Sequence, residues 1–148
     1  MEEMKLMLVD DEERFLRTTA KLLARKGITV FTAAGGAEAL ENLKRHNIHV
    51  VILDVKMPGM DGIATLKEIK RSFPLVEVVM LTGHGTVETA VEGLKSGATD
   101  FLSKPMDIDE LIQKAREAYE KRRILEEKIL SAHSDLIVKS PQNGKKAI

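Results

Sequence analysis

The sequence predicts an α/β fold built on a doubly wound, five-stranded parallel sheet. Three observations support this prediction. Five short aliphatic segments alternate with longer amphipathic ones along the chain. Most of the aliphatic segments are nearly continuous apolar runs, which is typical of parallel strands buried on both faces. The strict alternation indicates helices that cover both faces of one sheet through right-handed connections. Five strands of this size favour the order 2-1-3-4-5.

The elements can be placed along the chain. The strand candidates are residues 5–9, 29–33, 50–54, 76–81 and 99–102. The helix candidates that follow them are residues 12–26, 37–46, 63–72, 87–96 and 108 onward. A 3.6-residue period of core-facing positions marks the first helix, at Phe15, Thr19, Leu22 and Leu23.

Residues that start and stop helices stand at the expected places. Gly27 and Gly97 follow two of the helical patterns, where a left-handed C-cap belongs. Pro74 follows the third helix as a stop signal. Asp61 and Asp107 precede the third and fifth helices and suit the N-cap position.

The last helix extends beyond the part that a five-stranded domain needs. Spacings of four and three residues recur from Leu111 to Ala132, with charged residues between them. This pattern predicts a helical extension that forms a coiled-coil stem between two copies of the chain, although Arg122 in the seam argues against it. We expect a domain over residues 1–122, a helical extension over 123–133, and a disordered tail or truncated linker over 134–148.

Composition limits the classes of function. The 148 residues carry a formal net charge of zero, which gives no reason to expect nucleic acid or a membrane surface as a direct partner. No cysteine is present, which excludes disulfides and thiolate chemistry. The apolar runs are far shorter than the ~20 residues of a membrane span, and the N-terminus lacks a signal-peptide pattern. We therefore expect a soluble cytoplasmic protein.

Acidic residues follow two strands that would be neighbours in this sheet. Asp10 and Asp11 come after the first strand, and Asp54 ends the third. Adjacent strands lie about 4.8 Å apart, and ligands of such sheets bind at the carboxyl ends of the strands. Three converging carboxylates without a cation would be costly. Oxygen-only ligation suits Mg²⁺, so the sequence predicts a magnesium site.

Two further strand ends add a hydroxyl and an ammonium group to this crevice. Thr82 ends the fourth strand, and Lys104 and Pro105 follow the fifth. This set can bind a phosphoryl group on Asp54, which would act as the nucleophile, with the metal, Lys104 and Thr82 stabilising the phosphoryl oxygens. The Lys104–Pro105 bond is a candidate for the cis form. Gly83, in the Gly-His-Gly loop, could let the backbone approach the phosphoryl group.

The combination "LVDDEE", "LDVKMPGMDG", "LTGHGT" and "DFLSKP" resembles the response-regulator receiver domains of two-component signalling, which have a flavodoxin-like fold. The resemblance covers residues 4 to 120. It is greatest to the receivers of nitrogen-regulatory enhancer-binding (NtrC-like) activators. It implies a phosphorylation-activated switch that catalyses only its own phosphorylation and dephosphorylation, and no other enzyme activity.

The resemblance also implies roles for single residues. Asp54 would accept a phosphoryl group from a phosphohistidine of a sensor histidine kinase. Asp11, Asp54 and the backbone carbonyl of Lys56 would bind Mg²⁺, with Asp10 acting largely through water. Thr82 and Phe101 would form the switch pair that remodels the face around the fourth helix, fifth strand and fifth helix. As a separate hypothesis, Lys56 and His84 would limit attack by water on the aspartyl phosphate; the alternative is that His84 is a loop histidine without a role.

The partners implied are the kinase, a downstream effector domain or protein, and a second copy of the chain, and the output would be transcription regulation. In the relatives of this kind, an ATPase module and a DNA-binding module follow the receiver. This chain carries neither, so it would be a stand-alone or an excised receiver.

Several of these residues also have simpler interpretations, and other functions use a related fold. Singly, Asp10 and Asp11 could favour a helix start, Thr82 could simply end a strand, and Lys104 could be a solvated lysine. His46, His49 and His133 are expected at the surface. A haloacid-dehalogenase-like phosphatase would need a second aspartate where Lys56 stands. A flavodoxin-like cofactor binder would need a glycine- and hydroxyl-rich loop instead of four acids. A receiver fold used only as a scaffold would not need the acids, threonine and lysine together.

Overall fold

The computed structural model describes the backbone of residues 3–56, 61–83 and 87–142, with side chains through residue 134. Five parallel strands form one sheet in the order β2-β1-β3-β4-β5. The strands are β1 (Lys5–Val9), β2 (Thr29–Ala33), β3 (Val50–Asp54), β4 (Glu77–Thr82) and β5 (Asp100–Ser103). The helices are α1 (Glu13–Arg25), α2 (Gly36–Arg45), α3 (Gly62–Ser72), α4 (Val87–Lys95) and α5 (Ile108–Gln142). The fold class, strand order and long last helix predicted from the sequence are confirmed.

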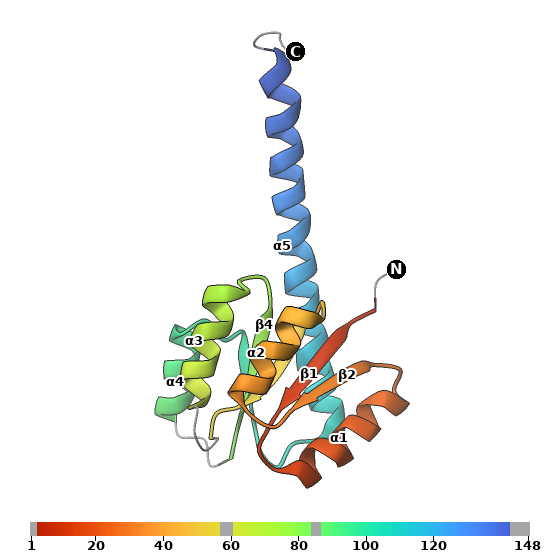
Figure 1. Cartoon of the computed structure of the whole chain (residues 1–148), viewed down its shortest axis with the longest axis vertical. Coiled ribbons are helices and arrows are strands. Elements are labelled where there is room, and N and C mark those ends of the chain that lie inside the picture. The colour runs from red at the N-terminus through yellow and green to blue at the C-terminus, as the bar shows by residue number, and fades with distance from the viewer. Residues whose placement is uncertain (1–2, 57–60, 84–86, 143–148) are drawn as a thin grey trace.

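Each face of the sheet has its own apolar core, because successive side chains of a strand point to opposite faces of the sheet. One core joins alternate residues of β1, β3 and β4 to α2 and α3, and it includes Met7, Leu53 and Leu66. The other joins the remaining strand residues to α1 and α5, and it includes Leu8 and Leu111. Figure 1 shows the sheet between these helical layers. Burial on both faces explains why the central strands read as continuous apolar runs.

The helix ends follow the local signals in the sequence. Gly27 and Gly97 have φ values of 83° and 110°, a region that favours glycine. The Asp61 side chain accepts a hydrogen bond from the backbone N–H of Ile63 and caps α3. Asp107 accepts from the N–H of Asp109 at the start of α5.

Helix α5 is the one element whose end differs markedly from the prediction. The helix was expected to end near residue 133, with a tail beyond it, but it continues to Gln142. No glycine or proline occurs between residues 106 and 140, so the chain lacks a strong helix breaker there. In Figure 1 the second half of α5 projects far beyond the sheet. No helix in the described part of the chain combines the length and apolar character of a membrane span.

Arg122 and His49 lie in the interior, at the end of the sheet where α5 leaves it. Arg122 is 7% exposed and donates a hydrogen bond of 2.8 Å to the carbonyl of Ile48. Its position in the apolar stripe therefore serves the domain, not a coiled-coil seam. His49 was expected at the surface, but it is 1% exposed, because its Nδ1 accepts from the N–H of Lys5 and its ring packs edge-on against Tyr119.

Candidate functional site

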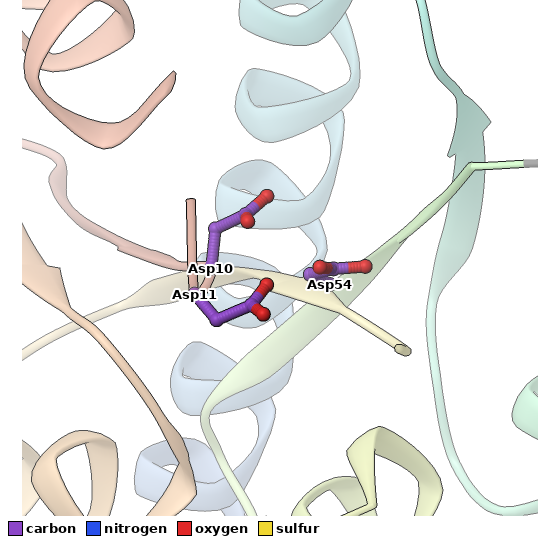
Figure 2. A group of neighbouring side chains, drawn as sticks. All are labelled: Asp10, Asp11 and Asp54. Carbon is purple, nitrogen blue, oxygen red and sulfur yellow. The ribbon is translucent and has the colours of Figure 1, made fainter. Parts of the chain in front are cut away.

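Three carboxylates converge at the carboxyl ends of β1 and β3. One carboxylate oxygen from each of Asp10, Asp11 and Asp54 lies within 4.8 Å of the other two. Asp10 and Asp54 are buried, whereas Asp11 is exposed. Figure 2 shows the carboxylates of Asp10 and Asp11 on one side of a shared space and Asp54 on the other. The parallel register brings them together, because Val9 of β1 pairs with Leu53, the residue before Asp54.

Asp54 is the most perturbed acid of this cluster. Burial is the main cause that raises its pKa from 3.8 to about 6, and the charges of Asp10 and Asp11 act in the same direction. The backbone N–H of Lys56, 3.1 Å from Oδ1, and the ammonium of Lys104 oppose the shift. Asp54 is therefore a buried carboxylate that is mostly ionised at neutral pH and surrounded by excess negative charge.

Lys104 supplies positive charge to the site. Its Nζ lies 2.7 Å from Oδ2 of Asp10, 2.9 Å from Oε1 of Glu12 and 4.0 Å from Oδ2 of Asp54. Burial works against the charged form, but the hydrogen bonds to Asp10 and Glu12 outweigh it and raise the pKa of Lys104. Lys104 is thus a fixed ammonium group at the edge of the acid cluster.

Thr82 is held at the end of β4 between the acid cluster and β5. It is 2% exposed, and its hydroxyl donates to the carbonyl of Leu102 at 3.3 Å. Its own carbonyl accepts from the N–H of Lys104 at 2.7 Å, which ties the two strand ends together. Phe101 is 38% exposed and lines a pocket of about 180 Å³ that Thr82 also lines. The two side chains predicted to act as a switch therefore border one cavity.

The remaining predicted residues are placed as follows. The Lys104–Pro105 peptide bond is cis, the form considered above. Nothing lies within 4 Å of a Cβ built at Gly83, so packing does not demand glycine there in this state. Lys56 is exposed, and its backbone N–H contacts Asp54. His84 lies outside the described residues.

The sequence pattern does not predict two contacts of Lys104, with the N-cap residue of α1 and with a residue of its first turn. Glu12 binds its ammonium, and the ring centroid of Phe15 lies 4.5 Å from Nζ. The segment "DDEERF" carries a signal for this, because residues 12 and 15 are three positions apart at a helix start and share a side. What the spacing did not show is that Lys104, 92 positions away, reaches this side of α1.

A groove opens beside the acid cluster, between α1 and the loop from β5 to α5. Its volume is about 710 Å³. It is lined by Phe15, Thr19, Leu22, Gly83, Lys104, Pro105, Met106, Asp107 and Ile108. Leu22 is 39% exposed on this side of α1, although the sequence period grouped it with the core. The lining is mainly apolar, which is suited to contact with another protein.

The donor set of the acid cluster fits Mg²⁺. The groups are carboxylate oxygens, which hard cations prefer, and three of them gather in one small space. Within 4 Å of these acids, Lys104 contributes one positive charge. A divalent cation would remove the charge imbalance that contributes to the raised pKa of Asp54.

The pattern of residues that defines the response regulator receiver domain matches residues 6–116. The chain belongs to this family. Receiver domains are signalling switches of two-component systems, not enzymes that turn over a separate substrate.

Characterised relatives are transcription regulators. The chain is 38% identical over 122 residues to the C4-dicarboxylate transport transcriptional regulatory protein DctD of Rhizobium meliloti, which covers 82% of this chain and 26% of the relative. It is 39% identical over 119 residues to the DNA-binding transcriptional regulator NtrC of Escherichia coli, covering 78% and 25%. The chain thus spans about a quarter of the length of these relatives.

Solved structures agree with this assignment. NtrX from Brucella abortus superposes with a TM-score of 0.80 at 36% identity, covering 85% of this chain and 29% of that one. A CheY-like receiver domain protein from Methanospirillum hungatei superposes with a TM-score of 0.78 at 26% identity, covering 82% and 98%.

Proposed function

We propose that the chain is a phosphorylation-activated switch in which Asp54 accepts a phosphoryl group from a phosphohistidine of a sensor kinase. The observation that carries the proposal is a buried carboxylate at the centre of an acid cluster, with an ammonium 4.0 Å away. A metal-binding structural site would need the acids alone. Neither the lysine nor the threonine at the adjoining strand ends would then have a role.

The chemistry is an in-line transfer. A carboxylate oxygen of Asp54 attacks phosphorus, a P–O bond forms, and the P–N bond of the phosphohistidine breaks with its electron pair left on the imidazole nitrogen. Mg²⁺, held by Asp11, Asp54 and the Lys56 carbonyl, with Asp10 through water, would neutralise charge on the phosphoryl oxygens. Lys104 supplies a further positive charge, and the Thr82 hydroxyl donates a hydrogen bond.

The same residues connect the site to a distant surface. In the unphosphorylated protein Thr82 donates to the carbonyl of Leu102, the residue before Ser103 at the end of β5. A phosphoryl oxygen would compete for this hydroxyl, and the side chain of Phe101 would turn into the pocket that it already borders. A group bearing ~2 negative charges thereby biases one of two arrangements of the face formed by α4, β5 and α5.

The proposal includes two partner surfaces. The apolar groove between α1 and the β5–α5 loop adjoins Lys104, so we infer that the kinase presents its phosphohistidine from this side. The exposed part of α5 would pair with a second copy of the chain. Because relatives of this chain are transcription regulators, an effector domain or protein that controls transcription is the proposed recipient of the signal, without direct contact between this chain and nucleic acid.

The test is the intact mass of the protein after incubation with acetyl phosphate, with and without Mg²⁺, beside Asp54→Asn. We expect a gain of one phosphoryl group that needs both the metal and Asp54. The decay of this adduct in Lys56→Ala and His84→Ala, each expected to be faster than in the unmodified sequence, tests their role in its lifetime. No gain by a folded protein that binds Mg²⁺ would favour a scaffold role instead. Steady release of phosphate without an adduct would favour a phosphatase, unless beryllofluoride, which mimics the phosphoryl group, binds at Asp54.

A further inference from the structure

Lys104 is held closer to Asp10 and Glu12, which precede α1, than to the proposed phosphoacceptor Asp54. Its Nζ makes close contacts of 2.7 Å and 2.9 Å with Asp10 and Glu12, but it remains 4.0 Å from Asp54. The ring of Phe15 also lies against the ammonium. Of these neighbours, Glu12 and Phe15 stand outside the acid cluster that fits the metal. They belong to the first turn of α1 and the residue before it.

Glu12 occupies the N-cap position of α1 without capping the helix. Its side chain makes no capping hydrogen bond, and glutamate is not among the residues preferred there. Its backbone N–H instead donates to Oδ1 of Asp10 at 2.9 Å, which fixes the loop between β1 and α1. The carboxylate is thereby directed to Lys104, and this contact is the clearest use that the structure gives it.

The geometry leads us to propose that Glu12 is a positioning residue: by binding Lys104 it offsets the ammonium charge and weakens capture of the phosphoryl group on Asp54. This inference rests on the proposed function of Asp54. When a metal engages Asp10, Glu12 is the remaining carboxylate on Lys104 that is not part of the cation site. An incoming phosphoryl dianion must then compete with Glu12 for the same ammonium group, and it also meets the negative charge of Glu12 nearby.

The chain offers a matched control in the next residue. Glu13 carries the same charge, but its side chain is 86% exposed and lies 3.6 Å from Arg17, one turn along α1. Glu12→Gln removes a charge and the carboxylate bond to Lys104, whereas Glu13→Gln removes a charge at nearly the same place and an exposed ion pair with Arg17, which is away from Lys104. Any difference between the two variants therefore reports on the contact with Lys104.

The experiment measures the affinity for beryllofluoride at saturating Mg²⁺ and fixed ionic strength, by amide NMR titration. The Glu12 side chain is 65% exposed, so the effect should match an exposed ion pair. We expect Glu12→Gln to bind beryllofluoride about two- to fivefold more tightly than the unmodified protein, and Glu13→Gln to change the affinity by less than about 1.5-fold. The KM for acetyl phosphate should fall in Glu12→Gln by a similar factor, while Mg²⁺ affinity measured by calorimetry should match that of Glu13→Gln.

The outcomes separate the two proposals. If the unmodified protein neither binds beryllofluoride nor takes up a phosphoryl group, the proposed function is wrong and the role of Glu12 falls with it. If the unmodified protein binds beryllofluoride and takes up a phosphoryl group, but the two variants bind beryllofluoride with equal affinity, Glu12 is an exposed acid without a positioning role. Weaker binding by Glu12→Gln would show that Glu12 helps to orient Lys104 toward the phosphoryl group, which also overturns the inference.

Discussion

At the scale of the residue, Asp54 combines two opposing demands. A nucleophile needs the ionised form, but burial and the neighbouring acids favour the protonated form and raise its pKa to about 6. The hydrogen bond from Lys56 and the charge of Lys104 limit the shift. The site thus carries unfavourable electrostatic energy in the metal-free protein, which a bound cation would relieve.

This raised pKa predicts how stability depends on pH. A carboxyl group whose pKa is raised in the folded state contributes stability below its unfolded value of 3.8, and that contribution is lost as pH rises toward 6. In EDTA, the unfolding free energy of Asp54→Asn should therefore exceed that of the unmodified protein by a margin that grows between pH 4 and 7. The margin should reach the order of 2 kcal/mol, since each pKa unit corresponds to ~1.4 kcal/mol and solvent screening reduces the full effect.

Urea denaturation of both proteins across this pH range measures the margin. Groups that titrate equally in both proteins contribute nothing to this difference. Saturating Mg²⁺ should stabilise the unmodified protein more than Asp54→Asn and so reduce the margin. A margin that does not vary with pH would show that the pKa of Asp54 is not raised on folding.

At the scale of the element, α3 and α4 each contain a buried glycine with a different neighbour. A Cβ added to Gly62, the first residue of α3, would overlap the backbone of Val55, whose carbonyl accepts the Gly62 N–H. A Cβ on Gly93 in α4 would overlap the far end of the Met80 side chain. A backbone next to Asp54 cannot move without displacing the site, but a flexible methionine can adopt another rotamer.

Alanine substitutions at these glycines should therefore have different costs. Gly62→Ala should lose about 2–3 kcal/mol of unfolding free energy through overpacking, and it should weaken Mg²⁺ binding, because Val55 follows Asp54. The unfolding free energy of Gly93→Ala should stay within about 1 kcal/mol of that of the unmodified protein, since the higher helix propensity of alanine offsets the displacement of Met80. Chemical denaturation and Mg²⁺ calorimetry measure both variants. Equal costs would show that the contact with Val55 does not decide the stability of α3.

At the scale of the whole molecule, α5 carries one stripe of residues at spacings of four and three, inside the domain and beyond it. Its first part is buried against the sheet, at Leu111, Ala115, Ala118 and Arg122. The same spacing of four and three residues continues past the domain at Leu125 and Ile129, which are 39% and 49% exposed. Arg122, which donates a hydrogen bond to the carbonyl of Ile48, is the last residue of this buried part. The continuation of an apolar stripe beyond the domain favours pairing with a second copy.

We predict that Ile129→Glu raises the dissociation constant of this dimer at least tenfold, because two charges would meet in the seam. Leu130→Glu is the matched control: Leu130 is 65% exposed on the same turn, but it lies outside the stripe. Analytical ultracentrifugation over a range of concentrations, with and without beryllofluoride, measures the effect. Equal dissociation constants in the two variants would contradict dimerisation through the exposed part of α5. So would an unmodified protein that is monomeric at every concentration, with and without beryllofluoride.

The sequence alone was sufficient for most of the fold and for the convergence of the three acids. The boundaries of β1 and β3 follow from runs of aliphatic residues that parallel strands bury on both faces. Asp10, Asp11 and Asp54 could be assigned to one crevice, because the carboxyl ends of neighbouring parallel strands share an edge. These features depend on local pattern and on a topology that the alternation of elements defines.

Tertiary structure decided the partners of long polar side chains. The contact between Lys104 and Glu12, the burial of His49, and the bond from Arg122 to Ile48 each join segments far apart in the chain. Hydrophobic periodicity records which face of an element is buried, but it does not record which polar atoms meet there. Those pairs depend on how the helices pack against the sheet, and the packing exists only once the chain has folded.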